Sequence, residues 1–370
     1  MQIYIVGGSV RDNILEINSK DTDFVVIGSN EKEFLSRFPK AKKVGTRKCV
    51  YILRGKEYTL SESKDIYEDL KVRDLTINAF AKDESGRIYG LPESFEDINN
   101  KILRPVSEKN FFDDPLRVFR AARFASVFPE FTFHSYLYEV MEAVGKSGLM
   151  HNISAERVGN ECLKACNGKN PGRFLELLSK TGCLYPWLKE FQNAHKIPAG
   201  PVPYHFGSVL DHIIEVMNEL KGSEIEVWMG LCHDIGKTIT DENIWPHHFD
   251  HDNKGEPLAL ELGERLKLPT KFIRAGAIAA KFHMKAGNYN KLSISKKIDL
   301  ILTLNKINLL KELFNFVKAD KRIDFYPEAL QHLNTVLSVS LPDDKKNLGV
   351  KSGEILHSIR CHKLKSTIKK

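Results

Sequence analysis

The sequence predicts an α+β protein, in which a small head with a mixed β-sheet precedes an all-helical neck and body and a further helical domain. Three observations support this. Up to about residue 105, short runs rich in β-branched and aromatic residues alternate with helical stretches, as in a small mixed sheet. After Phe111 strand signals nearly vanish and helical periodicity dominates. Between these helical parts, residues 197–203 are rich in proline and indicate an extended linker.

We therefore expect four parts: a head at 1–105, a helical neck and body at 106–200, a helical domain at 201–340 and a basic tail at 341–370. A length of 370 residues is too great for one ordinary core. The hydrophobic share of 42% argues against disorder. The tail is expected to be a frayed terminus, with a weak RNA contact as the alternative.

The composition also bears on partners and compartment. A net charge of +7 favours a polyanionic partner, although an ordinary basic protein remains the alternative. Six scattered cysteines, without a second pair to complete a zinc site, indicate reduced thiols. We see neither a secretory leader nor an apolar run long enough for a membrane span. The expectation is a cytoplasmic protein with no membrane partner.

The opening stretch contains the first candidate site. A strand at 1–6 leads into Gly7 and Gly8, where the backbone can turn and approach a ligand closely, and a short helix is expected at 10–17. Asp21 and Asp23 precede an apolar run and should lie on one face of a second strand. Two carboxylates beside such a turn are suited to a pair of Mg²⁺ ions roughly 3.5–4 Å apart, as used in phosphoryl displacement.

The remaining head elements follow from pattern alone. We expect helices at 31–38 and 74–80 and strands at 49–53, 57–60 and 87–91. A third carboxylate for the metal pair is left open between Glu57 and Glu62.

An arginine-rich helix is the second candidate site. Asp113-Asp114-Pro115 predicts a helix start with an aspartate cap. Arg117, Arg120 and Arg123 then recur every three residues on one face, without interleaved acids. Guanidinium groups suit triphosphate oxygens and base edges. Asp114 and Arg117 together offer the acceptor and donors needed to read a base that carries an exocyclic amine.

A histidine–aspartate series beyond the linker is the third candidate site. Its members are His212, His233, Asp234, His251, His283 and Asp320. One histidine alone is more often a core residue, but an ordered series across helices favours a metal site. Imidazole with carboxylate suits Mn, Ni, Fe or Co as well as Mg. An ion there would activate water against a phosphate ester.

Together these motifs resemble the bacterial tRNA CCA-adding enzymes (class II tRNA nucleotidyltransferases, related to poly(A) polymerases) with a fused HD phosphohydrolase domain. Arg73-Asp74 with Asn78-Ala79, and the segment 153–157, resemble further motifs of this family. The resemblance implies a polymerase-β-like head that adds C, C and A to tRNA from CTP and ATP without a nucleic-acid template. It implies that the HD domain has 2′,3′-cyclic phosphodiesterase, 2′-nucleotidase and phosphatase activities. A monomer or a homodimer is expected.

The resemblance also implies roles for single residues. Asp21 and Asp23 would bind Mg²⁺. Asp114 and Arg117 would pair with the incoming base, and the rest of the nucleotide would be held by Gly8, Arg11, Arg73, Arg120 and Arg123. The principal HD ligands would be His212, His233, Asp234 and Asp320, with His251 and His283 as ligands of a second ion or contacts to phosphate.

Two departures from the family leave alternatives open. Val72 replaces the first arginine of the Arg-Arg-Asp motif. The interval 61–72 is shorter than the flexible loop of the usual CCA-adding enzymes, and a short loop marks CC-adding enzymes that omit the final A. The alternatives are a CC-adding enzyme, or chiefly an HD phosphohydrolase acting on RNA ends. A tRNA-binding chaperone is the non-enzymatic reading.

Overall fold

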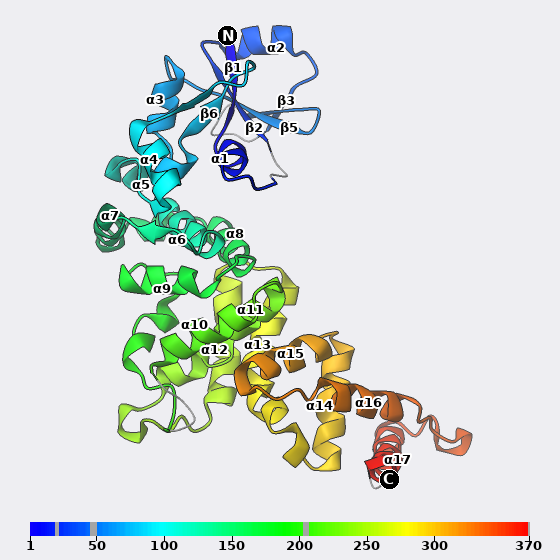
Figure 1. Ribbon diagram of the computed structural model, residues 1–370. Coiled ribbons are helices and arrows are strands. Elements are labelled where there is room, and N and C mark those ends of the chain that lie inside the picture. Colours follow the sequence, from blue (N-terminus) through cyan, green and yellow to red (C-terminus); the bar gives the residue numbers. More distant parts are fainter. Residues whose placement is uncertain (19–21, 45–49, 203–206, 369–370) are drawn as a thin grey trace. The chain divides into compact units, whose positions relative to one another are not determined.

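The computed structural model describes residues 1–18, 22–44, 50–202 and 207–368. Its contacts divide the chain into two compact units: Met1–Arg157 with Leu177–Pro186, and Val158–Glu176 with Trp187–Lys370. A mixed sheet lies in the first unit and helices dominate the remainder, so the α+β prediction is confirmed (Figure 1). The expected division into four parts stays a prediction.

The head is built on a seven-stranded sheet in the order β3-β4-β5-β2-β1-β6-β7. Its strands are β1 Gln2–Val6, β2 Asp23–Ile27, β3 Lys42–Val44, β4 Val50–Leu53, β5 Lys56–Leu60, β6 Phe80–Lys82 and β7 Ile88–Gly90. Only β2 and β5 pair in parallel; the other neighbours are antiparallel. The end of β1 lies beside the start of β2, because Val6 pairs with Asp23. The strand expected at 49–53 is confirmed for its described residues, and Cys49 lies outside them.

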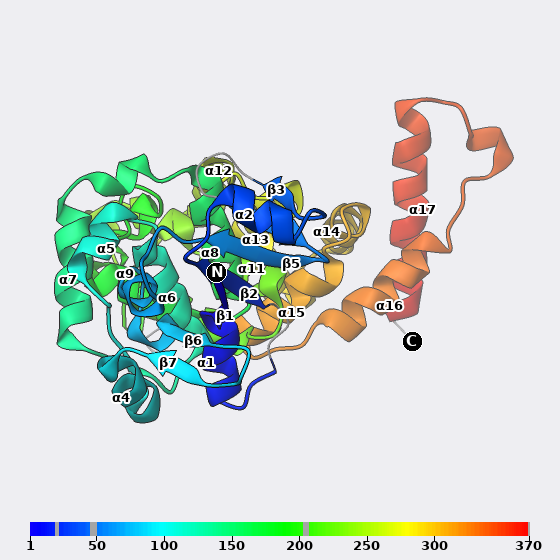
Figure 2. The ribbon, with the colours of Figure 1, turned by 90° about the horizontal axis from the view of Figure 1, so that it is seen from above.

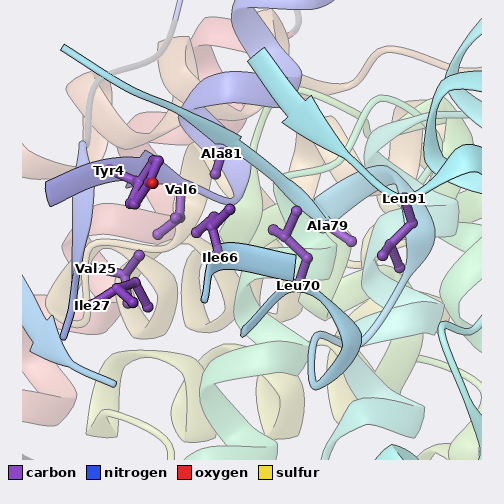
Figure 3. Close-up of a cluster of buried hydrophobic side chains, with 9 residues drawn as sticks. All are labelled: Tyr4, Val6, Val25, Ile27, Ile66, Leu70, Ala79, Ala81 and Leu91. Atoms are coloured by element: carbon purple, nitrogen blue, oxygen red, sulfur yellow. The ribbon is translucent and has the colours of Figure 1, made fainter. Parts of the chain in front are cut away.

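One face of the sheet packs against α3 (Ile66–Lys71) (Figure 3). Ile66 and Leu70 of this helix are buried with alternate residues of β1 and β2, Tyr4 and Val6 among them. The twelve residues of the shortened interval 61–72 therefore contain a helix that belongs to the core of the head. This helix was not expected from the sequence.

The other helices of the first unit are α1 Gly8–Ile14, α2 Glu31–Arg37, α4 Pro92–Asn100, α5 Glu108–Asp113, α6 Arg117–Val127 and α7 Ser135–Lys146. A two-stranded parallel sheet pairs β8 (Ile102–Leu103) with β9 (Thr132–Phe133). The helix predicted at 74–80 was wrong: the chain forms a short 3-10 helix η1 (Thr76–Asn78) and then enters β6. Pairing of β6 with β1 on one side and β7 on the other overrides the local helical pattern there.

Helices α8 (Ala155–Cys166) and α9 (Gly172–Lys180) are each divided between the two units. The second unit continues with α10 Val209–Glu219, α11 Glu224–Cys232, α12 His251–Arg265, α13 Thr270–Gly287, α14 Ile294–Lys306, α15 Leu310–Lys321, α16 Tyr326–Leu337 and α17 Val350–Ile368. In the described part of the chain, no helix has both the length and the apolar character that crossing a membrane requires.

The prediction of a frayed C-terminal tail was wrong. Residues Val350–Ile368 form α17, which contacts α14 and α16 (Figure 2). Leu364 is fully buried in this contact and Arg360 donates a hydrogen bond of 3.2 Å to the carbonyl oxygen of Val336. Burial of an apolar side chain outweighs the basic, weakly patterned composition from which fraying was expected.

Candidate functional site

Asp23, the described member of the predicted carboxylate pair, lies beside the glycine turn. Gly7 follows the last residue of β1 and has a φ of 71°, and α1 begins directly after it at Gly8. Asp23 opens β2 next to the end of β1, and its partner across the parallel pair is Glu57 on β5. Desolvation and the negative charge of Asp23 both raise the pKa of Glu57. Asp21 lies outside the described residues, so its predicted place beside Asp23 stays a prediction.

A chain of buried hydrogen bonds connects the Arg73-Asp74 motif to α6. Asp74 accepts a bond of 2.9 Å from the Asn78 amide and pairs with Nε of Arg120 at 2.7 Å. Burial alone raises the pKa of Asp74, but Arg120 and the hydrogen bonds from Asn78 and the Leu75 amide outweigh it, and the net pKa is well below the ordinary value. Asp74 is thus a fixed anion inside the head.

Arg11 extends this chain back to the glycine turn. Its guanidinium donates to the side-chain Oδ1 of Asn78 and, at 2.7 and 2.9 Å, to Asp12. The same group lies 5.2 Å from the ring centroid of Phe124 on α6 and 4.8 Å from that of Phe128, directly after this helix. Arg11 is only 7% exposed. The structure therefore gives it contacts that fix the turn against α6, and its role as a nucleotide ligand stays a prediction.

Asp114 and Arg117, the two residues predicted to read the base, have other partners in this structure. Asp114 makes a two-pronged ion pair with Arg157, at 2.7 and 3.1 Å. Arg117 donates to the carbonyl oxygens of Val72 and Arg73 at 2.7 and 3.1 Å. The predicted aspartate cap was wrong: α5 ends at Asp113 and α6 begins at Arg117 without a side-chain cap.

The remaining predicted arginines also lie around this region. Arg73 pairs with Asp69 on α3. Arg123 lies 4.0 Å from the ring of Phe124, and its positive charge, together with the larger effect of burial, lowers the pKa of Arg11. The glycine turn, Asp23, the Asp74 network and the arginine face of α6 thus form one continuous region of the first unit.

The six predicted HD residues come together in the second unit. His212 lies on α10, His233 and Asp234 follow α11, His251 opens α12, His283 lies on α13 and Asp320 on α15. Among the described residues, two groups could each hold an ion: His212 and His233 with Asp234, and His251 and His283 with Asp234. Asp234 belongs to both groups.

Distances within the cluster fit a common centre. Oδ2 of Asp234 lies 3.5 Å from Nε2 of His212 and 3.2 Å from Nε2 of His233, while those two nitrogens are 3.1 Å apart. Oδ1 of Asp234 lies 3.5 Å from Nε2 of both His251 and His283, which are also 3.1 Å apart. Asp320 lies 3.3 Å from His212.

Backbone carbonyls fix the orientation of three of these rings. Nδ1 of His233 lies 2.8 Å from the Gly230 carbonyl oxygen, Nδ1 of His251 lies 2.6 Å from that of His248, and Nδ1 of His283 lies 2.9 Å from that of Ala280. A carbonyl oxygen only accepts, so we assign the proton to each Nδ1. The Nε2 lone pairs then point into the cluster, as in metal-ligating histidines.

The pKa values of residues in the cluster differ strongly from their ordinary values. Burial lowers the pKa of His251 to about 4 and also lowers that of His233, because it outweighs the opposing effect of the Asp234 carboxylate, which raises both. Asp234 has a pKa well below its ordinary value, because the attraction of His233 and Lys237 exceeds the effect of burial. A pocket of about 190 Å³ opens here, lined by Asp234, His251, His283 and Asp320 among others.

Sequence reasoning missed several residues of these sites. The sequence marks Asn78 only as part of the Asn-Ala motif, and it predicts no role for Asp69 or Arg157. Lys237 follows the His-Asp pair in the sequence and places Nζ 2.7 Å from Asp234, but its role was not foreseen. Its spacing of three residues from Asp234 in one helical turn was the signal available.

Comparison with known proteins gives the family. The poly(A) polymerase head domain matches residues 3–58, and the probable RNA- and SrmB-binding site of polymerase A matches residues 130–194. The chain is 34% identical over 315 residues to the multifunctional CCA protein of Haemophilus influenzae, covering 76% of this chain and 75% of that protein. The chain belongs to the family of multifunctional CCA proteins. The multifunctional CCA protein of Tolumonas auensis is 32% identical, over 76% of this chain and 74% of its own length.

Solved structures agree with the family's fold. A crystal structure of the Bacillus stearothermophilus CCA-adding enzyme in complex with CTP is similar over 99% of this chain and 89% of that one, with a TM-score of 0.67 and 22% identity. The Thermotoga maritima CCA-adding enzyme complexed with tRNA is similar over 98% and 87%, with a TM-score of 0.65 and 20% identity. The fold is thus that of a CCA-adding enzyme.

Proposed function

We propose that this chain is a tRNA nucleotidyltransferase that adds CCA to the tRNA 3′ end from CTP and ATP without a nucleic-acid template. Family membership supports the reaction class. The observation that carries the proposal is the continuity of the glycine turn, Asp23 and the arginine face of α6. An anion placed there would meet a backbone turn, carboxylates suited to metal ions and guanidinium groups.

Mg²⁺ fits the donors of this region. We infer that Asp23 and Glu57, with Asp21, hold the ions, because carboxylate oxygens are the ligands that Mg²⁺ prefers. Burial and then the charge of Asp23 raise the pKa of Glu57, and a bound cation would relieve the repulsion between the two carboxylates. Mg²⁺ there would supply charge stabilisation at the transferred phosphoryl group and lower the pKa of the tRNA 3′-hydroxyl.

Binding of the nucleotide would fall to the chain's own residues. Burial first, and then Arg120 and Arg73, lower the pKa of Arg117, against the opposing effect of Asp74 and Asp114. A triphosphate would relieve this crowding of positive charge. We infer that Arg73, Arg120 and Arg123 contact the triphosphate, and that Asp114 and Arg117 read the base, as the family resemblance implies.

One gel tests this reaction. The full chain is incubated with tRNA that lacks its CCA end and with labelled CTP, ATP or both. Addition of three nucleotides with both substrates would support the CCA-adding reading, and arrest after two would establish the CC-adding alternative. Asp23→Ala should abolish extension and Glu57→Gln should reduce it by at least tenfold, whereas Glu62→Gln, an exposed residue, should leave it unchanged. Extension that survives Asp23→Ala would refute the proposal.

The histidine cluster favours a second activity, a metal-dependent phosphohydrolase. Nε2 of His251, Nε2 of His283 and Oδ1 of Asp234 converge at 3.1 and 3.5 Å with no donor among these three atoms. Three acceptors so close repel one another unless a cation lies between them. Separations of this size are those of neighbouring ligand atoms about 2.1 Å from one ion.

We therefore infer a two-ion centre bridged by Asp234. His212, His233, Asp320 and Oδ2 of Asp234 would hold one ion, and His251, His283 and Oδ1 the other. Mn, Ni, Co or Fe suits imidazole with carboxylate, and Mg remains open. Such a pair would supply activated water and charge stabilisation at a phosphate ester. Lys237 would keep the bridging carboxylate in place through its contact of 2.7 Å.

Metal counting tests the centre without an activity assay. The Asp23→Ala variant, which weakens the head site, is loaded with Mn²⁺, gel-filtered and measured by elemental analysis. We expect about two ions per chain, about one after His283→Ala and none after Asp234→Ala. His362→Ala on the exposed face of α17 is the control and should keep two. A count of one that His283→Ala leaves unchanged would contradict the second ion.

A further inference from the structure

The pocket over the histidine cluster has an aromatic rim. Its lining includes His247, Phe249 and Met284 as well as the candidate metal ligands. The rings of His247 and Phe249 stack with centroids 5.6 Å apart and planes 12° from parallel. Phe249 is 68% exposed, compared with 48% for Tyr185. The exposed ring of Phe249, stacked with His247 and lining the same pocket as the candidate metal ligands, therefore offers an aromatic face at the mouth of that pocket.

Buried hydrogen bonds of His248 hold the backbone of the segment that carries these two rings. His248, between them, is 8% exposed and lies 2.7 Å from both the Thr240 hydroxyl and the carbonyl oxygen of Pro198. The Trp245 indole donates to the same hydroxyl at 3.3 Å. The rings of His247 and Phe249 therefore project from a fixed backbone and can present a face without first being ordered.

We propose that His247 and Phe249 form a base-stacking platform, which binds the base of a nucleotide whose phosphate lies at the candidate metal ligands. This rests on the proposed phosphohydrolase function. The phosphate would lie at the metal ligands, near Lys237 and Lys321, and the base on the exposed ring of Phe249. Every base has a π-face, so the platform would require a base without selecting which one.

The size of the pocket supports this division. A volume of about 190 Å³ is below the roughly 300–1,000 Å³ of pockets that enclose a whole small molecule. It suits a phosphate and part of a ribose, while the base remains at the rim. Met284, 37% exposed in the same lining, adds an apolar surface beside the platform. The charged groups near the phosphate and the apolar groups at the rim match the two ends of a nucleotide.

A substrate with a base and one without a base distinguish the contribution of this platform from that of the metal centre. The full chain, loaded with Mn²⁺, is assayed for phosphate release from adenosine 2′-phosphate and from glycerol 2-phosphate, which has no ring. Phe249→Ala should raise KM for the nucleotide by roughly 5- to 100-fold and leave KM for glycerol 2-phosphate and both kcat values unchanged. Phe249→Trp should restore the nucleotide KM.

The controls keep the outcomes distinct. Tyr185→Ala removes another exposed aromatic ring and should change neither KM, and unchanged metal content shows that Phe249→Ala is folded at the centre. An equal rise of KM for both substrates, or none for the nucleotide, would overturn the platform. A loss confined to an RNA oligonucleotide ending in a 3′-phosphate would also overturn it, in favour of a contact to the RNA chain.

Absence of hydrolysis would refute the phosphohydrolase function but still leave the platform measurable. Calorimetric titration with adenosine 2′-phosphate and with inorganic phosphate then gives the answer. The platform predicts that Phe249→Ala weakens binding of the nucleotide by the same factor and leaves binding of phosphate unchanged. Equal affinities of the wild type and the variant for the nucleotide would reject it.

Discussion

Replacing Asn78 by alanine tests the hydrogen-bond chain that joins the glycine turn to α6. The side chain of Asn78 accepts a hydrogen bond from Arg11 through Oδ1 and donates one to Asp74 through Nδ2. All three side chains are nearly inaccessible, at 5%, 7% and 5% exposed. Alanine removes both bonds and supplies neither partner. Because solvent has little access to Arg11 and Asp74, water does not replace the hydrogen-bond partner that each of them loses.

The magnitude follows from what each group keeps. A buried polar group left without a partner costs about 1–3 kcal/mol. Arg11 keeps its bonds to Asp12, and Asp74 keeps those from the Leu75 amide and Arg120, so the lower part of this range applies to each. We expect a local loss of about 2–4 kcal/mol, which is roughly a 30- to 1,000-fold change in an opening equilibrium.

Hydrogen exchange measured by mass spectrometry is the suitable assay. Trp187, Trp228 and Trp245 all belong to the second unit, so tryptophan fluorescence does not report on the head. Amides of α1, η1 with β6, and α6 should exchange about 30- to 1,000-fold faster in the variant. Asn99→Ala, an exposed change on α4, is the matched control and should alter exchange little.

Two results would refute this reasoning. Exchange in Asn78→Ala no faster than in Asn99→Ala would mean that the chain of hydrogen bonds does not stabilise the head. Exchange accelerated equally in α12 and α13 of the second unit would mean that the effect is not local. If the glycine turn and α6 must keep their relative positions to bind one nucleotide, tRNA extension should fall in parallel with the loss of protection from hydrogen exchange.

Further changes test other features. The lowered pKa of Asp74 gives stability that is complete above the ordinary carboxyl pKa of about 3.9 and is lost as pH falls toward the folded pKa. The urea midpoint by circular dichroism should therefore fall more steeply from about pH 5 to about pH 3 in the wild type than in Asp74→Asn; equal slopes would contradict this. A Cβ at Gly236 would overlap the carbonyl oxygen of His251, so Gly236→Ala should lower both the melting temperature and the Mn²⁺ content, whereas Gly353→Ala, with open space around it, should change neither. Retention of two ions in Gly236→Ala would argue against the close contact. Burial raises the pKa of Cys162, Cys166, Cys183 and Cys232, so a thiol reagent should modify at most two of the six cysteines before unfolding, and rapid reaction of more would show that these thiols are accessible.

Much of the site could be predicted because its signals are local. The glycine turn follows directly from a pair of glycines after a β-branched run, and Gly7 does take the positive φ that favours glycine. The apolar face of α6 follows from a spacing of three residues, and Leu116, Phe119 and Ala122 are buried. Motifs made of residues adjacent in the sequence can be recognised without knowledge of the tertiary structure.

What could not be predicted depends on partners distant in sequence. Asp114 was read as a cap because only its neighbours were visible, yet its partner is Arg157, 43 residues away. The segment at 74–80 was read as a helix because nothing local shows that β1 and β7 lie on either side of Phe80–Lys82. Glu57 became the stronger candidate for the third head carboxylate only through the register that pairs it with Asp23. Tertiary pairing decides such positions.

The two candidate metal centres should differ in how they hold their ions. Asp23 and Glu57 are exposed near the start of β2 and β5, whereas Asp234 is 2% exposed and is surrounded by histidines whose rings are oriented by backbone carbonyls. An exposed carboxylate pair binds Mg²⁺ mainly together with substrate phosphates, because the ion keeps much of its water otherwise. A buried, oriented ligand set holds its ions without substrate. We therefore expect dialysis to strip the head ions unless a nucleotide is present, and the ions of the histidine cluster to persist until a chelator is added.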